Sequence, residues 1–420
     1  MGFFKFSDEL NELSASVLAE CSEKFNEIND ITEYNQQLVL KAFIDNGVSE
    51  SHFAGSTGYG YGDRGRDLLD KVAAQIFGTE SAIISHNFVS GTHTLGVMLF
   101  GVLRPGDRVL CATGVPYDTI HSVIGIDGKG KGQGSLADYG IEFDILDLKS
   151  DGTVDLEGLK EKITTGNYRA VYIQRSRGYT LRPSLTTPKI KEITSIVKAN
   201  SKAITILDNC YGEFTEKLTL EGSGVDIFAG SLIKNPGGGI AKCGGYIAGR
   251  SDLVELCSYR FTTPGIGREV GATLGNTRDI FMGLFHAPHV TGEALKTAVF
   301  TAALFEKMGY EVSPSSKEDR ADIIQSIKLC TSEKLIAFCQ GLQSGSVIDS
   351  YVVPEPSPMP GYESDVIMAA GAFTNGSSIE LSADAPLREP FAVWLQGGLN
   401  FHSAKIGVLL GAQRVIDVQK

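Results

Sequence analysis

Several features that mark specialised classes of protein are missing from this chain of 420 residues. It has no run of about 18 apolar residues, the length of a helix that crosses a bilayer, so we expect no membrane span. Basic residues are outnumbered by acidic ones, 38 against 50, and the formal net charge is −12. A chain with this balance is a poor candidate for binding nucleic acid or an anionic membrane.

Cysteine and metal-binding patterns are also sparse. The seven cysteines are scattered and none forms a C-x-x-C pair, which is typical of reduced thiols in a cytoplasmic protein. The N-terminal segment soon becomes charged and has no apolar core of signal-peptide length, so we expect it to be part of the fold. His286 and His289 have ligand-like spacing, but Pro288 lies between them and no acidic or thiol partner is evident, so we expect no metal site.

What the chain does contain is a regular alternation of short apolar runs and helical patterns. Most of the runs are rich in β-branched residues and largely unbroken, as in strands buried on both faces. The alternation predicts an α/β fold with a mainly parallel sheet flanked by helices, which binds ligands at the carboxyl ends of its strands. The expected strands are Ala82–Ser85, Arg108–Ala112, Ile141–Leu148, Ala170–Gln174, Ala203–Leu207, Asp226–Ala229 and Gly244–Ala248, and the clearest helices are Leu68–Phe77, Thr94–Leu103, Leu156–Ile163 and Ile190–Ala199.

The length and the pattern predict three parts: an N-terminal helical arm at 1–50, a large domain at 51–300 and a small α+β domain at 301–420. A long helical stretch, Gly267–Met308, is expected to be interrupted at the His286–His289 segment. In the small domain we expect strands and a terminal helix. The strands are Ile323–Leu329, Ser346–Val353, Val366–Ala372 and Ser378–Leu381, and the helix is Phe401–Gln413.

Two charged residues sit at or after the ends of expected strands. Asp208 closes the strand AITILD, where it could cap a helix or pair with a buried cation such as a protonated pyridine nitrogen. Lys234 precedes Pro-Gly-Gly-Gly, where it could be a surface lysine or a Schiff-base lysine on a turn that gives a cofactor room. Ser231, three residues earlier, could donate a hydrogen bond to a phosphate.

Two loops between a strand and a helix complete the pattern. Ser90, Gly91 and Thr92 precede an apolar helix, where they could simply cap it or could bind a phosphate at its N-terminus. Tyr117 follows the strand RVLCA, where it is either a half-buried loop residue or a ring that stacks on a flat heteroaromatic ligand.

A phosphate loop, a stacking ring, an aspartate and a lysine in this order resemble the fold-type I enzymes that use pyridoxal 5′-phosphate (PLP). The segments GYGYGDRGRD, SHNFVSGTHT, QRSRGY, ILDNCYGEF, GSLIKNPGGG and LREPFAVWLQGG are similar to the cystathionine β-lyase and methionine γ-lyase group, and within it to the aluminium-resistance proteins. The resemblance covers most of the chain. It implies the aspartate aminotransferase-like fold, a seven-stranded sheet, and a homodimer or homotetramer with a shared active site.

The resemblance also implies roles for individual residues. Lys234 would carry PLP as a Schiff base and move protons, and Asp208 would pair with the pyridine nitrogen. Ser90, Gly91, Thr92 and Ser231 would hold the phosphate, and Tyr117 would stack on the ring. Tyr61 and Arg64 resemble a pair that reaches the phosphate from a neighbouring subunit, although here the pair is spaced one residue wider.

One position departs from the family pattern. Where the sulfur-amino-acid lyases have an arginine for the substrate carboxylate, this chain has Glu380. Arg388, eight residues later, is the expected substitute, and Arg175 and Arg177 in the QRSRGY loop are rivals; each could instead form a structural ion pair.

The function that the resemblance implies is elimination of a thiol or similar group from Cβ or Cγ of a sulfur-containing amino acid. Aminotransferase or decarboxylase activity is the alternative within enzymes. The alternative outside them is a stress-protection protein that binds PLP without turnover, or binds none.

Overall fold

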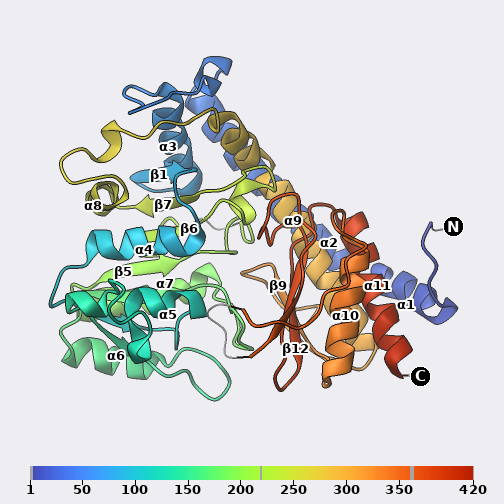
Figure 1. Ribbon diagram of the computed structural model, residues 1–420. Helices are drawn as coiled ribbons and strands as arrows, with labels where there is room; N and C mark the ends of the chain where they lie inside the picture. The colour runs from blue at the N-terminus through green and yellow to red at the C-terminus, as the bar shows by residue number, and fades with distance from the viewer. Residues whose placement is uncertain (1–2, 218–219, 360–363, 420) are drawn as a thin grey trace.

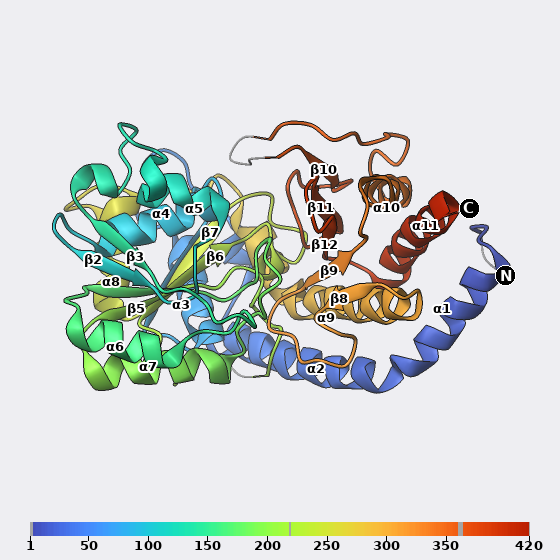
Figure 2. The same ribbon diagram turned by 90° about the horizontal axis from the view of Figure 1, so that it is seen from below.

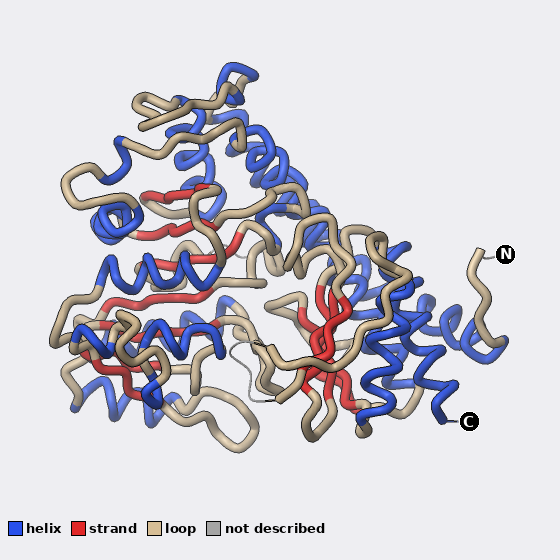
Figure 3. The backbone as a smooth tube through the Cα atoms, in the orientation of Figure 1, coloured by secondary structure: helices blue, strands red, loops and turns tan. Residues whose placement is uncertain are grey.

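The computed structural model describes residues 3–217, 220–359 and 364–419. Within them the strands form two sheets, one of seven strands and one of five, which lie side by side (Figure 1). Figure 3 shows the two groups of strands with helices around each. The seven-stranded sheet with its helices is called the large lobe, and the five-stranded sheet with its helices is called the small lobe.

The larger sheet has the strand order β1-β7-β6-β5-β4-β2-β3. Strand β7 runs antiparallel to both of its neighbours, and the other pairings are parallel. The expected mainly parallel sheet is therefore confirmed, strand by strand. Its members are β1 (Ser81–Ser85), β2 (Arg108–Cys111), β3 (Glu142–Ile145), β4 (Ala170–Gln174), β5 (Ile204–Asp208), β6 (Ile227–Ser231) and β7 (Gly245–Gly249).

Helices cover both faces of this sheet because successive residues of each strand point to opposite sides. In β2, Leu110 belongs to one hydrophobic core and Val109 and Cys111 to the other. The first core is shared with α2 (Ser22–Asp45), α3 (Arg64–Phe77), α6 (Leu156–Thr165), α7 (Thr187–Asn200) and α9 (Thr277–Lys307), and the second with α4 (Gly91–Val102), α5 (Asp118–Ile124) and α8 (Ser251–Phe261).

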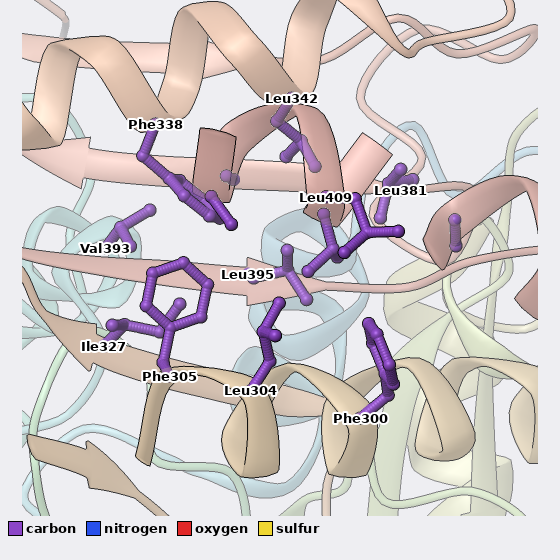
Figure 4. Packing of buried hydrophobic residues seen from close by; sticks show 14 of the residues in the cluster. Phe300, Leu304, Phe305, Ile327, Phe338, Leu342, Leu381, Val393, Leu395 and Leu409 are labelled. Atoms are coloured by element: carbon purple, nitrogen blue, oxygen red, sulfur yellow. The ribbon is translucent and has the colours of Figure 1, made fainter. Parts of the chain in front are cut away.

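The smaller sheet has the order β10-β11-β12-β9-β8 and is antiparallel throughout. One face packs against helices: Val393 and Leu395 lie among Phe305 of α9 and Phe338 of α10 (Figure 4). The elements are β8 (Glu311–Ser313), β9 (Ile324–Lys328), α10 (Ser332–Ser344), β10 (Val366–Ala369), β11 (Ser382–Pro386), β12 (Ala392–Gln396) and α11 (Phe401–Gln419).

The other face of the small sheet is turned toward the large lobe. Trp394 of β12 pairs with Asp384 of β11 and with Ser326 of β9, so these side chains share a face opposite to that of Val393 and Leu395. We call this the site face. Trp394 packs there with Tyr179 and Tyr211 of the large lobe. The small sheet thus sits between its own helices and the large lobe, as Figure 2 shows.

The N-terminal arm is two helices, α1 (Asp8–Glu20) and α2, with a break at Cys21. Three expectations about the flanking segments are wrong. Helix α9 starts at Thr277 and continues through Pro288, because its buried faces pack along both lobes and outweigh one lost hydrogen bond. The segment 346–353 forms turns, and β11 begins one residue after the strand expected at 378–381. Strands β8 and β12 and helix α10 were not expected.

None of the helices built from described residues is both long and apolar enough to cross a membrane.

Candidate active site at the edge of the large sheet

Lys234 lies just beyond β6, in a tight turn that ends in a short 3-10 helix. The turn needs glycine at position 237, because a Cβ there would come within 1.6 Å of the Leu232 carbonyl oxygen. Lys234 is half-buried, and its Nζ lies 3.8 Å from the centre of the Tyr211 ring. The turn therefore holds the amino group against an aromatic face instead of letting it reach solvent.

Asp208 is the last residue of β5, the strand next to β6. Only 4% of Asp208 is exposed; one carboxylate oxygen accepts from the Cys210 N–H at 3.1 Å and the other from the Tyr172 hydroxyl at 3.5 Å. Burial raises the pKa of Asp208, while the Lys234 charge and the Cys210 N–H act to lower it; the net direction is upward. The positive charge near this carboxylate therefore does not fully compensate for its burial.

The charge of Lys234 is set by the same neighbours. Burial acts to lower its pKa, but Cys210, Tyr211 and Asp208 raise it, and the net direction is upward. The aspartate and the lysine thus form an electrostatically coupled pair at the carboxyl edge of the parallel strands, where the sequence pattern predicts a ligand site.

The expected phosphate loop lies beside this pair. Ser90 caps α4, its hydroxyl accepting from the His93 N–H at 3.0 Å. A Cβ at Gly91 would meet the Ser231 Cβ at 3.2 Å, so the N-terminus of α4 touches the end of β6. Ser231 is 1% exposed and its Oγ has no hydrogen-bond partner among the described residues. The Thr92 hydroxyl lies 2.7 Å from that of Thr119.

Tyr117 directly precedes α5 and is half-buried. Its backbone N–H donates to Gln174 Oε1 at 2.7 Å, which ties the loop to the end of β4. Its ring centre lies 5.6 Å from that of Tyr179, with the planes tilted by 59°. The tyrosine is therefore held by the scaffold in a fixed orientation at the edge where Asp208 and Lys234 lie.

Tyr61 and Arg64 lie elsewhere on the surface. Both are exposed, and Tyr61 stacks obliquely on the exposed ring of Tyr59 at 5.5 Å. No hydrogen bond or ion pair within the described part of the chain joins Tyr61 or Arg64 to the residues around Lys234.

The three candidate arginines are placed differently from one another. Arg175 is fully engaged: its guanidinium binds Glu216, Asn209 and the Leu185 carbonyl. Arg177 is 1% exposed, donates to Ser313 Oγ at 2.9 Å and lies 3.7 Å from Asp322. Arg175 thus has the structural role that was its alternative.

Arg388 is exposed in the turn between β11 and β12, whereas Glu380 is buried. The Glu380 carboxylate accepts from the backbone N–H groups of Phe373 and Thr374 at 2.7 and 2.8 Å. Glu380 therefore fixes a loop of the small lobe, and its hydrogen-bond partners are backbone N–H groups, with no ion pair to a basic side chain among the residues that the structure describes.

Several residues at this edge were missed by sequence reasoning. Tyr211, with φ of +71°, covers Lys234, and its hydroxyl accepts from Ser378 Oγ at 3.1 Å. Its position, three residues after Asp208, could have identified Tyr211 from the sequence. Tyr179 donates to Asp384 at 2.7 Å, and Gln396 Nε2 donates to the same oxygen at 2.7 Å. Nothing in the one-dimensional pattern placed Asp384 or Gln396 near Lys234.

The described residues contain no group of three His, Cys, Asp or Glu side chains that could hold a metal ion.

Comparison with known proteins gives consistent results. The family model described as methionine gamma-lyase matches residues 10–416. The uncharacterized protein YnbB of Bacillus subtilis is 45% identical over 411 residues, which cover 98% of this chain and 97% of that protein.

Two solved structures are similar to this chain over nearly the full length of both. One from Clostridium novyi NT, described as a carbon-sulfur lyase involved in aluminium resistance, is 49% identical with a TM-score of 0.94, covering 98% of this chain and 96% of that one. One from Clostridium acetobutylicum, described as a candidate cystathionine beta-lyase involved in aluminium resistance, is 48% identical with a TM-score of 0.94, covering 97% and 96%. The fold is that of the fold-type I PLP enzymes, and the chain belongs to the methionine gamma-lyase family.

Proposed function

We propose that this protein is a PLP-dependent carbon–sulfur lyase that acts on a sulfur-containing amino acid by α,β- or α,γ-elimination. The proposal rests on two buried polar groups at one edge of the sheet that lack a compensating charge or a hydrogen-bond partner. Asp208 is buried without enough positive charge, and the Ser231 hydroxyl is buried without a partner. A cofactor with a cationic ring nitrogen and a phosphate would satisfy both.

The residues present fit this cofactor. Asp208 would hold the proton on the pyridine nitrogen, and Ser231, Ser90, Thr92 and the backbone N–H of Gly91 would bind the phosphate at the start of α4. Tyr117 would lie against the ring. Lys234 would attach the cofactor covalently, because its Nζ lies at the same edge as Asp208 and is kept from solvent by Tyr211.

When bound, PLP supplies an electron sink for the pair left behind when the substrate Cα loses its proton. The chain supplies the rest. Lys234 Nζ would take that proton and carry it to the atoms that need it later. Tyr211 and the small lobe would keep water away from Nζ, and Asp208 would keep the ring nitrogen protonated. Lyase activity is favoured over other PLP chemistry because the relatives are described as carbon–sulfur and cystathionine lyases.

The proposal includes a second copy of the chain. Tyr61 and Arg64 are exposed, and Val89 and Val115, which flank the Ser90 and Tyr117 loops, are 78% and 55% exposed. Exposed apolar residues beside a polar site are typical of an interface. We propose a homodimer or homotetramer in which Tyr61 and Arg64 of one subunit reach the phosphate site of the next. All seven thiols are free, which supports a reducing, cytoplasmic location.

Cofactor binding is tested first by colour and by chemical trapping. The purified protein should absorb visible light, and reduction with borohydride should fix one PLP to the peptide that contains Lys234, as read by mass spectrometry. A colourless protein, or a label on another lysine, would remove the proposal.

The reaction is tested with cysteine, cystathionine and methionine, assaying 2-oxo acid and ammonia. Elimination gives both products in equal amounts. Formation of an amine instead identifies a decarboxylase, and oxo acid that forms only with an amino-group acceptor identifies an aminotransferase; either result refutes the lyase assignment.

The shared site is tested by subunit mixing. Inactive Lys234→Ala and inactive Arg64→Ala chains, unfolded and refolded together in equal amounts, should regain about a quarter of wild-type activity, because half of the dimers carry one intact site. No recovery would place Arg64 in the site of its own subunit or outside any site.

A further inference from the structure

The site face of the small sheet contributes two polar side chains to the region of Lys234. Asp384 of β11 and Gln396 of β12 are 5% and 4% exposed. They belong to neighbouring antiparallel strands and face the large lobe together with Trp394. Trp394 packs with Tyr211, whose ring lies 3.8 Å from Lys234 Nζ, so the site face adjoins the region of Lys234, and the Lys234 charge acts to lower the pKa of Asp384. The two residues therefore form part of the wall across from the proposed cofactor anchor.

The hydrogen bonds of this pair leave two acceptors unused. Asp384 Oδ2 accepts from the Tyr179 hydroxyl and from Gln396 Nε2, both at 2.7 Å. An ionised carboxylate only accepts hydrogen bonds, so the amide must turn its nitrogen toward Asp384 and its oxygen away. Asp384 Oδ1 and Gln396 Oε1 are both buried without a donor among the described residues. Leaving such groups unpaired is costly, about 1–3 kcal/mol each.

Two neighbouring acceptors, one of them anionic, call for a ligand that has several donors and positive charge. A carboxylate would be repelled, and a thioether or methyl group would leave both oxygens unpaired. An ammonium group has three donors and a full charge, which are the two properties that this pair of acceptors lacks in a partner. Lys234 is the cation whose charge acts on Asp384, and Asp384 also interacts with Tyr179, Tyr211 and Cys339.

We propose that Asp384 and Gln396 form a subsite for an ammonium group on the side chain of the substrate, so that the enzyme prefers amino acids that carry a second amino group beyond the scissile bond. This deepens the proposed function and rests on it. Position 380 has a glutamate where the sulfur-amino-acid lyases have an arginine. The lack of that positive charge in the small lobe is consistent with a subsite that receives a cation.

The test compares ligands of matched shape in the enzyme loaded with PLP. L-lysine and L-2-aminoheptanoate differ only in a terminal ammonium in place of a methyl group, and L-ornithine and L-norleucine form a shorter pair. None of them has a leaving group, so binding is measured by calorimetry without turnover. One charge-assisted hydrogen-bond pair predicts that the charged member of at least one pair binds about 10-fold or more tightly.

Three variants test whether the preference for the charged ligand depends on Asp384 and Gln396. Asp384→Asn should reduce the preference to about twofold or less and leave the affinity for 2-aminoheptanoate and norleucine unchanged. Gln396→Met tests the same subsite if Asp384→Asn does not fold, and should reduce the preference in part. Asp226→Asn, at a buried acid of the large lobe that binds Thr205, is the control and should keep the wild-type preference.

Two further readouts complete the design. The preference should fade as the pH falls through about 6, where Asp384, whose pKa burial raises to about 6, becomes protonated, while the lysine side chain stays charged. In turnover, S-(2-aminoethyl)-L-cysteine should exceed S-propyl-L-cysteine in kcat/KM by a similar factor.

Equal binding of both members of both pairs would show that the two oxygens bind only water and would overturn the inference. If PLP is bound and lysine has no advantage, the subsite alone fails; if no PLP is bound, the proposed function fails.

Discussion

The two walls of the candidate site are built on different principles. The wall of the large lobe consists of residues at strand ends and in the loops that follow: Asp208 ends β5, Ser231 ends β6 and Lys234 lies three residues beyond. The wall of the small lobe consists of Asp384 and Trp394 within strands and Gln396 at the end of β12, and the residue before each of them, Ala383, Val393 or Leu395, belongs to the core. A change on the first wall should affect the cofactor, and a change on the second should affect the substrate and the docking of the two lobes.

This difference has a physical origin. A loop residue at the edge of a parallel sheet can change without disturbing packing, so chemistry concentrates there. A residue on the site face of β11 or β12 is fixed by the alternation of the strand, because Ala383 and Leu395 must point into the core. The small lobe therefore offers few positions, but each is held rigidly.

The largest effect should come from the large-lobe wall. Lys234→Ala removes the covalent anchor and the group that moves the Cα proton, so kcat should fall about 10³- to 10⁴-fold. Borohydride reduction followed by mass spectrometry should then find no specific label. A variant with near-normal kcat would abolish the distinction between the walls, because the chemistry would lie elsewhere.

Trp394→Ala tests the second wall. The indole is 6% exposed, packs 5.5 Å from the Tyr179 ring and donates to the Thr180 carbonyl at 3.4 Å. Its removal should lower the free energy of unfolding by about 3–5 kcal/mol. The folded variant should still bind PLP, as its visible spectrum would show at low temperature. Loss of the cofactor from a folded variant would mean that the two walls are not separable.

Asp208→Asn tests whether the large-lobe wall acts on the cofactor and leaves substrate selection unchanged. It keeps the shape but removes the charge that would hold the ring-nitrogen proton, so kcat/KM should fall about 10- to 100-fold. The preference for lysine over 2-aminoheptanoate should stay as in the wild type, because it depends on the other wall. A changed preference with normal kcat/KM would reverse the assigned roles.

The smallest effect is expected from Tyr179→Phe, at the residue that joins the walls. Its hydroxyl binds Asp384 and its ring lies beside Tyr117. Loss of this hydrogen bond should cost about 1 kcal/mol of unfolding free energy. The bond lowers the pKa of Asp384, so its loss should raise that pKa, and the lysine preference should disappear at a higher pH than in the wild type. Calorimetric titrations between pH 5 and 8 would measure the shift, and an unchanged midpoint would separate Tyr179 from the charge of Asp384.

The sequence by itself determined the large lobe and its wall. The strands of the parallel sheet are short apolar runs, and Asp208, Lys234, Ser231, Tyr117 and the Ser90–Thr92 segment lie at the ends of strands or in the loops that follow them, so their meeting at one edge follows from local order. The roles of these residues stay predictions until the cofactor is shown. The exact start of α9 and its passage through Pro288 could not be predicted from the sequence, because packing against both lobes decides them.

The small-lobe wall was decided only by the tertiary structure. Short antiparallel strands such as β12 carry a weak pattern, and an aspartate on β11 looks the same whether it faces solvent or a site. The register of β11 on β12 and the docking of the sheet through Trp394, Tyr179 and Tyr211 bring Asp384 and Gln396 to Lys234. The same docking places Arg388 in an exposed turn. Local sequence specifies which residues end a strand, but only long-range packing specifies which face of a strand meets another lobe.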